Sequence, residues 1–330
     1  MTGRPSEDEL IARYFAPMAG TGGLALQDDA ALLEPTPGHE LVLTCDTIVH
    51  GVHYLPDDPP ASIACKALAV NVSDLVAKGA EPKGFLLSLG LPGDWTEEWL
   101  AGFAAGLGEA VTAFGCPLLG GDTVRVAGGA IIGVTAVGEV AAGRMLRRTT
   151  ARPGDRVCVT GTIGDAAVGL ALRRERDASW ARGTPLAHRA FLADRYLHPH
   201  PRVRLLPALR SHARAAMDVS DGLVGDLAKM MRVSGTTAVV DVPAVPLSPA
   251  TGALVAAEPA LLDLALAGGD DYEVLFTVPE PSLGALLAEA DGLGVAVAVI
   301  GLVEAGDGPP RFRDADGGER SFARASYSHF

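Results

Sequence analysis

The sequence predicts an α/β (or α+β) fold of two domains, and three observations support this. The chain has 330 residues, which allows one or two domains of roughly 100–200 residues each. Apolar segments typical of strands alternate with segments that have helical periodicity. A basic, proline-broken stretch, GRMLRRTTARPGDR, interrupts this pattern. We therefore expect one α/β domain over 1–150 and a second over 151–330.

The first predicted domain begins with a short helix. Ser6 and Glu9 have the spacing of a capping box, which predicts a helix through about Phe15. After a loop, ELVLTCDTIV is expected to form a strand whose polar end is at Cys45 and Asp46. LLGGDTVR is expected to be a short strand that runs into a turn. The remaining elements are helices over about 60–79 and 96–114 and the strands FLLSLGLP and AIIGVTAVGEV.

The second predicted domain begins at the strand RVCVTG, which leads through a glycine turn into a helix over about 165–176. The segment AAMDVSDGLVGDLAKMM combines a strand, an acidic turn and a helix. The remaining expected elements are helices near 184–194, 203–212 and 281–290 and the strands YEVLFTV and AVAVIGLV.

Composition and charge exclude several classes of protein. The net charge of −13 argues against a partner that is nucleic acid or an anionic membrane, because both attract basic surfaces. Four widely spaced cysteines without a C-x-x-C pair indicate reduced thiols in a cytoplasmic protein. The polar start, MTGRPSEDEL, is not a signal peptide, and no apolar stretch reaches the ~18 residues of a membrane span.

Several common catalytic motifs are absent from the sequence. It has no G-x-x-x-x-G-K-[ST] phosphate loop, no G-x-G-x-x-G dinucleotide fingerprint and no H-E-x-x-H, G-x-S-x-G or H-R-D signature. The pairs His50/His53 and His198/His200 lack the third or fourth ligand that a zinc site needs. A turn before the helix is the simpler explanation of the second pair.

The carboxylates, in contrast, form a pattern. Most of the notable aspartates are expected at strand ends or in glycine turns: Asp28-Asp29, Asp46, Asp122, Asp218/Asp221 and Asp270-Asp271. Within the predicted helix over 60–79, Asn71, Asp74 and Lys78 form one polar line on an otherwise apolar segment. Each aspartate alone could simply favour a turn or a helix start.

Together, these carboxylates indicate divalent cations. Crowded carboxylates repel one another unless cations lie between them, and Mg²⁺ combines one or two carboxylates with the phosphates of a substrate. Backbone amides at Gly120-Gly121 and over 160–164 could help to hold phosphate oxygens. The residues therefore favour a protein that binds a nucleoside triphosphate through several Mg²⁺ ions.

The chain resembles the thiamine-monophosphate kinase family of the aminoimidazole ribonucleotide synthetase superfamily. The matching segments follow the family order along nearly the whole chain: QDDAALL, TCDTIVHGVHYLP, KALAVNVSDLVAKGAEP, LLGGDTVR, GRMLRR, RPGDRVCVTGTIGDAAVGL, MDVSDGL, GGDDYEVLF and SYSHF. The resemblance implies phosphorylation of thiamine monophosphate to thiamine diphosphate, with ATP as co-substrate and several Mg²⁺ ions. It also implies a homodimer in which strands of the N-terminal domains pair, and a C-terminal domain that covers the nucleotide and substrate.

The resemblance also implies roles for individual residues. The positions that match metal ligands are Asp29, Thr44, Cys45, Asp46, Asp74, Asp122, Asp218 and Asp221. The positions that match ATP contacts are Gly121, Asp122, Arg148 and Ser220. The positions that match substrate contacts are His53, Asp270 and Phe322. Asp46, Asp122 and Arg148 are expected to be catalytic, although Arg148 could instead be a solvated charge.

Three residues depart from the family pattern. Gln27 replaces a glycine before the paired aspartates, Cys45 replaces a threonine or serine, and Asp270 replaces a glutamate. A thiol is a poor ligand for Mg²⁺, so either the carbonyl of Cys45 serves or one metal is held less tightly. Asp270 shortens its side chain by one methylene.

Direct in-line transfer is the expected mechanism. The acceptor phosphate has a second pKa of roughly 6 and is mostly dianionic at neutral pH, so no general base is needed. The alternatives are a ligase like aminoimidazole ribonucleotide synthetase and a non-catalytic protein that binds Mg-ATP. A selenophosphate synthetase-like enzyme is disfavoured, because the first cysteine is Cys45 and the usual N-terminal cysteine is absent.

Overall fold

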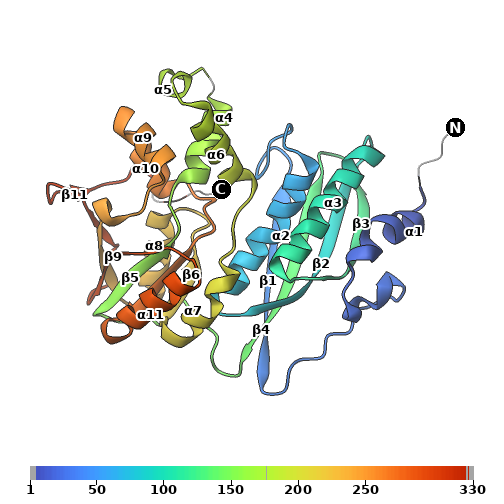
Figure 1. Cartoon of the computed structure of the whole chain (residues 1–330), viewed down its shortest axis with the longest axis horizontal. Helices are drawn as coiled ribbons and strands as arrows, with labels where there is room; N and C mark the ends of the chain where they lie inside the picture. Colours follow the sequence, from blue (N-terminus) through green and yellow to red (C-terminus); the bar gives the residue numbers. More distant parts are fainter. Residues whose placement is uncertain (1–4, 176, 325, 327–330) are drawn as a thin grey trace. The chain divides into compact units, whose positions relative to one another are not determined.

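The computed structural model describes residues 5–175, 177–324 and 326 (Figure 1). The chain forms two compact units. The first unit comprises Met1–Leu75 and Ala80–Met145, and the second comprises Val76–Gly79 and Leu146–Phe330. Each unit contains one sheet with helices packed on it, so the predicted α/β class is confirmed. The closing segment SYSHF lies almost entirely outside the described residues.

A four-stranded sheet forms the centre of the first unit, in the order β1-β4-β2-β3. Its strands are β1 (His39–Val49), β2 (Glu81–Pro92), β3 (Leu118–Val126) and β4 (Ile131–Ala141). Strand β4 runs antiparallel to β1 and β2, whereas β2 and β3 are parallel. Strands β1, β2 and β3 therefore share one direction, and their carboxyl ends meet at the same edge of the sheet.

The two long helices of the first unit cover one face of this sheet. Helices α2 (Pro60–Ala77) and α3 (Glu97–Phe114) lie on it in Figure 1. Leu87 and Leu89 of β2 are buried, whereas Leu86 and Ser88, which point to the opposite face, are exposed. That open face carries apolar side chains, among which Leu43 is 64% exposed and Val124 is 48% exposed. A single copy of the first unit thus presents a partly apolar sheet surface.

The N-terminal helix starts where the sequence predicts. The side chains of Ser6 and Glu9 form the capping box, which opens α1 (Glu7–Leu10). The chain continues to Phe15 as a π-helical segment, and short 3₁₀ segments follow at Ala16–Met18 and Thr21–Leu26. The expected helix is therefore present, but its second half is wound more loosely.

The two strands that carry Asp46 and Asp122 span nearly the predicted segments, but these aspartates do not lie at the strand ends as expected. Asp46 was predicted at the polar end of a strand and Asp122 close to a turn, but both lie within strands. The ladder continues because Thr47 pairs with Gly133 of β4 and Thr123 pairs with Leu89 of β2. Backbone hydrogen bonds to neighbouring strands thus extend both strands beyond the acidic residues, which side-chain polarity alone does not reveal.

The second unit is built on a seven-stranded sheet in the order β11-β10-β7-β9-β5-β8-β6. Its strands are β5 (Asp155–Thr160), β6 (Ala215–Asp218), β7 (Thr237–Asp241), β8 (Val274–Pro279), β9 (Val297–Glu304), β10 (Arg311–Arg313) and β11 (Glu319–Arg320). Its helices are α4 (Asp165–Arg174), α5 (Ser179–Arg182), α6 (Leu186–Leu197), α7 (Leu206–His212), α8 (Leu223–Ser234), α9 (Pro249–Ala257), α10 (Leu261–Ala267) and α11 (Glu280–Gly292).

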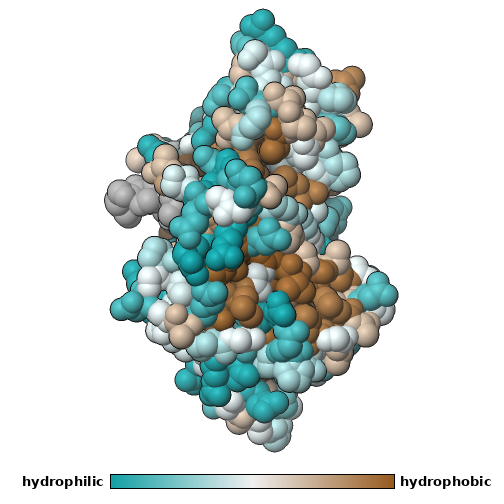
Figure 2. All heavy atoms as spheres, turned by 90° about the vertical axis from the view of Figure 1, so that its left-hand side faces the viewer, coloured by the Kyte–Doolittle hydropathy of each residue, from teal (hydrophilic) through white to brown (hydrophobic). Residues whose placement is uncertain are grey.

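The predicted strands and helices of this unit are present, but six elements were not expected: α5, α9, α10, β7, β10 and β11. Helices α9 and α10 lie in an alanine-rich region with little contrast between their faces. The strands are short and depend on pairing with distant partners. Figure 2, which faces this unit, shows apolar side chains gathered in the lower half of the view and bordered by polar ones.

Helix α2 is the one described helix whose length and composition would allow it to cross a membrane, and 78% of that segment is buried inside the protein. Its apolar character is explained by this burial, because Ala64, Leu68 and Leu75 are fully buried. It is therefore a core helix of the first unit.

Candidate functional site

Three of the predicted site residues line one cavity of the first unit. This cavity has a volume of about 730 Å³, and Asp29, Gly121 and Asp122 are part of its wall. Asp28 and Ser88 line it as well. The sequence brings these residues together because the loop before β1 lies near the edge strand β3. Two exposed carboxylates beside strand backbone are groups that can hold a cation and the phosphates it carries.

Gly121 shapes this cavity through its backbone. A Cβ atom at this position would lie 1.9 Å from the carbonyl oxygen of Leu87. Any side chain would therefore separate β3 from β2. The glycine lets the backbone beside Asp122 stay open to a ligand.

A second group of predicted site residues lies between β1 and α2. The Thr44 hydroxyl donates to an oxygen of Asp74 at 2.5 Å, and the backbone N–H of Asp46 donates to Asn71 Oδ1 at 2.9 Å. Asn71 is fully buried. Two residues of the polar line predicted on this helix, Asn71 and Asp74, therefore hold the β1 segment that carries Asp46.

Lys78, the third residue of that polar line, does not join this group. The structure assigns it to the second unit, where its ammonium donates to the carbonyl of Ala216 at 2.8 Å. The three residues follow the predicted helical spacing, but Lys78 contacts a different unit from the one that contains Asn71 and Asp74.

The two groups face opposite sides of the sheet. Thr47, Gly133, Ser88 and Asp122 occupy one row across the four strands, so their side chains share the open face. Asp46 is adjacent to Thr47 and therefore points to the other face, like Thr44. Three strand spacings of about 4.8 Å separate the two edge strands, so Asp46 and Asp122 lie roughly 14 Å apart.

Cys45 lies on the open face, away from Thr44 and Asp46, because neighbouring residues of a strand alternate. Its side chain is exposed and its row partner is Thr135 of β4. The thiol therefore cannot join the group of Thr44, Asp46 and Asp74 in the same copy of the chain. Of the two possibilities for Cys45, this geometry favours its carbonyl as the donor.

His53 lies in the turn after β1 and is held by its backbone surroundings. Its Nδ1 accepts a hydrogen bond from the backbone N–H of Val49 at 3.0 Å, and Lys66 donates to its carbonyl at 3.1 Å. Because Nδ1 is the acceptor, a neutral ring carries its proton on Nε2. These two hydrogen bonds fix the position of His53 and of its ring.

In the second unit, the DVSDG segment forms a compact turn between β6 and α8. Asp218 ends β6, and the backbone N–H groups of Ser220 and Asp221 both donate to Asp226 Oδ2, at 3.0 and 2.9 Å. Asp226 is fully buried, and burial raises the pKa of its carboxyl although Lys229 opposes this. Asp226 was not among the predicted site residues, and its only signal in the sequence is an acidic residue in the first turn of the following helix.

Lys229 is a second residue that the sequence analysis missed. Its ammonium lies 2.5 Å from an oxygen of Asp221 and 3.0 Å from one of Asp226. Asp221 was expected to be a metal ligand, and here a lysine already supplies a positive charge to it. The acid–base spacing of Asp226 and Lys229 was the available sequence signal.

The GGDDYE segment approaches the same turn. The backbone N–H of Asp270 donates to the carbonyl of Ser220 at 2.8 Å, and that of Tyr272 donates to Val219 at 2.8 Å. A Cβ on Gly269 would lie 2.4 Å from the Ser220 carbonyl, so only glycine permits this approach. The structure therefore brings together Asp218, Ser220, Asp221 and Asp270.

Asp270 and Tyr272 have left-handed backbone conformations, with φ of 66° and 51°. Such conformations are costly for residues other than glycine and are concentrated at functional sites. The Tyr272 hydroxyl lies 3.3 Å from Asp270 Oδ1. The segment thus displays a carboxylate that has a hydroxyl beside it.

Buried anchors hold this strained segment. Both oxygens of Asp271 lie 2.9 Å from the backbone N–H of Gly164, and burial raises the pKa of Asp271 well above its usual range. Glu273, which is fully buried, accepts from Thr160 at 2.6 Å, from Arg195 at 2.9 Å and from Arg202. Alternate residues are therefore fixed in the core while Asp270 and Tyr272 face outward.

The last two predicted residues lie in different surroundings. The side chain of Arg148 is exposed, and its carbonyl accepts from the Ser234 hydroxyl at 3.0 Å. Phe322 is half-buried and packs edge-on against Phe312, with ring centroids 5.1 Å apart. The backbone near Arg148 is thus fixed while its guanidinium remains available.

Among the described residues, no three His, Cys, Asp or Glu side chains are close enough to form a complete metal cluster. The donors on the first unit are oxygens of Asp28, Asp29, Asp46, Asp74 and Asp122. Such incomplete oxygen sets suit Mg²⁺, which takes its remaining ligands from water and substrate phosphates. The donor chemistry therefore fits Mg²⁺ bound together with a phosphorylated substrate.

Comparisons with known proteins agree with this chemistry. Residues 27–140 match the family model of the AIR synthase related protein N-terminal domain, and residues 152–310 match that of the C-terminal domain. The chain is similar to the thiamine-monophosphate kinase of Salmonella typhimurium, with 42% identity over 98% of both chains. It is also similar to the Bacillus subtilis thiamine-monophosphate kinase, with 32% identity over 93% of both.

Solved structures are similar as well. The thiamine-monophosphate kinase of Stenotrophomonas maltophilia K279a is 40% identical, with a TM-score of 0.81, and covers 89% of this chain and 91% of its own. AaThiL complexed with AMPPCP and TMP is 32% identical, with a TM-score of 0.77 over 92% and 91% of the two chains. The Escherichia coli HypE structure, at 20% identity and a TM-score of 0.78, shares the fold.

Proposed function

This chain belongs to the thiamine-monophosphate kinase family, and we propose that it transfers the γ-phosphoryl group of ATP to thiamine monophosphate, forming thiamine diphosphate and ADP. The observation that carries this proposal is the cavity with Asp29, Gly121 and Asp122 on its wall. It combines carboxylates and backbone in a protein without a phosphate loop. The AMPPCP and TMP held by a relative at 32% identity support both substrates.

Mg²⁺ is the cofactor proposed for this reaction. Its ligands would be the side chains of Asp29, Thr44, Asp46, Asp74, Asp122, Asp218 and Asp221 and the carbonyl of Cys45. When bound, it would neutralise the phosphate charges and help to align the two substrates. Because Lys229 already contacts Asp221, this ligand position would depend on competition between an ammonium and a metal ion.

We propose direct in-line transfer without a phosphoenzyme. The acceptor phosphate, with a second pKa of roughly 6, is itself a nucleophile at neutral pH, so the protein needs to orient rather than deprotonate it. Asp46 and Asp122 would hold the reacting phosphates through their ions. Arg148 would stabilise the charge that develops during transfer, which its exposed guanidinium allows.

The remaining predicted residues would bind the substrates. Gly121 and Ser220 would contact ATP, and His53, Asp270 and Phe322 would contact thiamine monophosphate. The fixed N–H of His53 suits an oxygen acceptor. In this arrangement residues 1–150 carry the metal and nucleotide site, and residues 151–330 cover the nucleotide and substrate. We place the protein in the cytoplasm, as expected for reduced thiols.

We further propose that the active form is a homodimer. The open face of the first sheet is partly apolar, with Leu43 64% exposed. Asp46 and Asp122 lie on opposite faces and roughly 14 Å apart, which is too far for one ion to contact both. Pairing of the first sheets from two copies through their open faces would cover these apolar side chains.

The decisive experiment measures ADP and thiamine diphosphate formed from Mg-ATP and thiamine monophosphate, with thiamine and no acceptor as controls. We expect equal amounts of both products, and only with the monophosphate. Asp46→Asn should reduce kcat by at least about 100-fold, because it removes a charge that faces the phosphates. Asp307→Asn, an exposed turn substitution with the same charge change, should leave kcat unchanged.

Folded protein that binds Mg-ATP but releases no acceptor-dependent ADP would refute the kinase proposal. It would favour the non-catalytic or ligase alternatives. Equal activity of Asp46→Asn and Asp307→Asn would instead refute the role of Asp46.

A further inference from the structure

The first unit contains a second, larger cleft that the proposed reaction does not use. Its volume is about 970 Å³, and it lies where β1, β2 and β3 end. The chemistry-bearing residues on its wall are His50, Tyr54, Asp94, Trp95, Trp99 and Arg125. No residue assigned above to metal, ATP or substrate lines it. Carboxyl ends of parallel strands are a common place for ligand binding in α/β folds.

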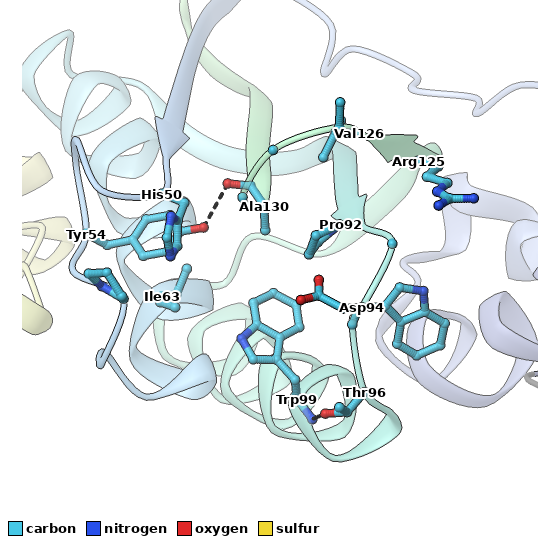
Figure 3. A pocket seen from close by; sticks show the side chains of 16 residues that line it. His50, Tyr54, Ile63, Pro92, Asp94, Thr96, Trp99, Arg125, Val126 and Ala130 are labelled. Carbon is cyan, nitrogen blue, oxygen red and sulfur yellow. Dashed lines mark hydrogen bonds between the residues drawn. The ribbon is translucent and has the colours of Figure 1, made fainter.

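The aromatic side chains of this cleft are fixed. The Tyr54 hydroxyl donates to the carbonyl of Ala130 at 2.8 Å, and the His50 ring meets the Tyr54 ring edge-on at 5.6 Å (Figure 3). Trp99 stacks on Phe103 of the same helix, with centroids 5.3 Å apart and planes 14° apart. The walls formed by Tyr54 and by Trp99 are therefore already ordered before a ligand binds. A flat ring can bind between them with little loss of side-chain entropy.

The carboxylate of Asp94 indicates which charge a ligand of this cleft should carry. Figure 3 shows the Asp94 carboxylate beside the indole of Trp99 and facing the cleft. In the described part of the chain, Asp94 has no ion pair or hydrogen bond that would satisfy this carboxylate, and it is exposed. Burial raises the pKa of Tyr54, so its phenol stays neutral. An indole face and a carboxylate together favour a positive charge in a flat ligand.

We propose that this cleft binds a flat heteroaromatic cation, with its ring against Trp99 and its positive charge beside Asp94. Arg125 of β3 also lines the cleft and offers a positive charge to an anionic substituent of such a ligand. The inference does not depend on the phosphoryl transfer proposed above, since binding can be measured without ATP or Mg²⁺.

A matched pair of ligands tests the role of charge. 1-Methylnicotinamide is a flat heteroaromatic cation, and nicotinamide is its neutral analogue of nearly the same shape. Trp95 and Trp99 are two of the three tryptophans, so their fluorescence reports binding in the cleft. We expect saturable quenching by the cation, with a Kd roughly 3- to 30-fold lower than that of nicotinamide by calorimetry.

Variants locate the site. Asp94→Asn should weaken binding of the cation several-fold and leave nicotinamide binding unchanged, and Asp94→Lys should abolish cation binding. Glu98→Gln removes the same charge from an exposed position on α3 outside the cleft and should have no effect. Thiamine monophosphate kinase activity should be unchanged in all three variants. Folded wild-type protein without saturable binding, or equal Kd values for Asp94→Asn and wild type, would overturn the proposal.

Discussion

At the scale of single residues, the most informative contact is that of Lys229 with Asp221. Burial of Lys229 lowers its pKa, but hydrogen bonds and charge interactions with Asp221 and Asp226 outweigh this and raise the pKa, so the side chain is protonated at neutral pH. Its ammonium lies 2.5 Å from the carboxylate proposed as a metal ligand. The protein therefore supplies its own cation where the family pattern suggests a metal.

Lys229→Met should consequently strengthen divalent-cation binding. Removing one positive charge beside Asp221 should make the binding free energy of Mn²⁺ more favourable by about 1–2 kcal/mol, which lowers its Kd roughly tenfold. Mn²⁺ serves here as a paramagnetic substitute for Mg²⁺. Electron paramagnetic resonance titration measures this directly. Lys83→Met, which removes a lysine paired with Glu81 and Glu139 in the first unit, is the control. Identical Mn²⁺ binding in the two variants would contradict the competition.

At the scale of elements, the GGDDYE segment shows how a strained loop is used. Gly269, Asp270 and Tyr272 have positive φ, while Asp271 and Glu273 are buried anchors. The Tyr272 hydroxyl lies 3.3 Å from Asp270 Oδ1 and can orient the carboxylate that we propose as a substrate contact. This matters because Asp270 is one methylene shorter than the usual family residue.

Tyr272→Phe should therefore raise KM for thiamine monophosphate. Loss of one hydrogen bond worth about 1 kcal/mol should increase KM roughly fivefold and change kcat much less. Initial-rate kinetics measure the split between the two constants. Tyr14→Phe, in the N-terminal segment, should behave like wild type. A purely structural role of Tyr272 would instead lower the unfolding midpoint without changing KM.

The buried charges behind this segment make a prediction about stability. Glu273 faces Arg195 and Arg202, and it is fully buried. Glu273→Gln removes the buried carboxylate that both arginines share and leaves only Asp165, 4.0 Å from Arg195, as a counter-charge, so the free energy of unfolding should fall by about 3 kcal/mol. Urea unfolding followed by circular dichroism tests this. Glu304→Gln, whose pair with Arg311 is largely exposed, should cost less than about 1 kcal/mol.

At the scale of the whole molecule, the open face of the first sheet predicts self-association. Leu43→Asp adds a charge to this face and should convert the proposed dimer to a monomer, with loss of most kinase activity. Light scattering coupled to size exclusion measures the mass. Leu186→Asp, at a leucine that is 85% exposed in the second unit, should remain dimeric and active. A fully active wild-type monomer would rule out the dimer.

Much of the fold and of the candidate site could be predicted because it depends on local patterns. The capping box of Ser6 and Glu9, the apolar strand around Asp46 and the polar line of Asn71 and Asp74 are short-range signals, and each appears in the structure. The aspartates were found from residue type and neighbouring glycines. The family motifs then assigned them roles that remain proposals.

Other features depend on contacts between distant segments. Pairing of β1 with β4 and of β3 with β2 continues past Asp46 and Asp122, so the expected position of these aspartates at strand ends was wrong. Asp226 and Lys229 were missed because their importance arises from the turn that they hold. Strands β10 and β11 are too short to show a clear strand pattern in the sequence. They form because β10 pairs with β7 and β11.

The sequence by itself determined the α/β class, most elements, the family and the set of candidate oxygen ligands, because periodicity and short motifs are encoded over a few residues. Only the tertiary structure decided which of these ligands meet. Sheet register places Asp46 and Asp122 on opposite faces, and side-chain alternation removes the Cys45 thiol from the Asp46 group. Register arises from pairing between distant strands, so no local pattern contains it.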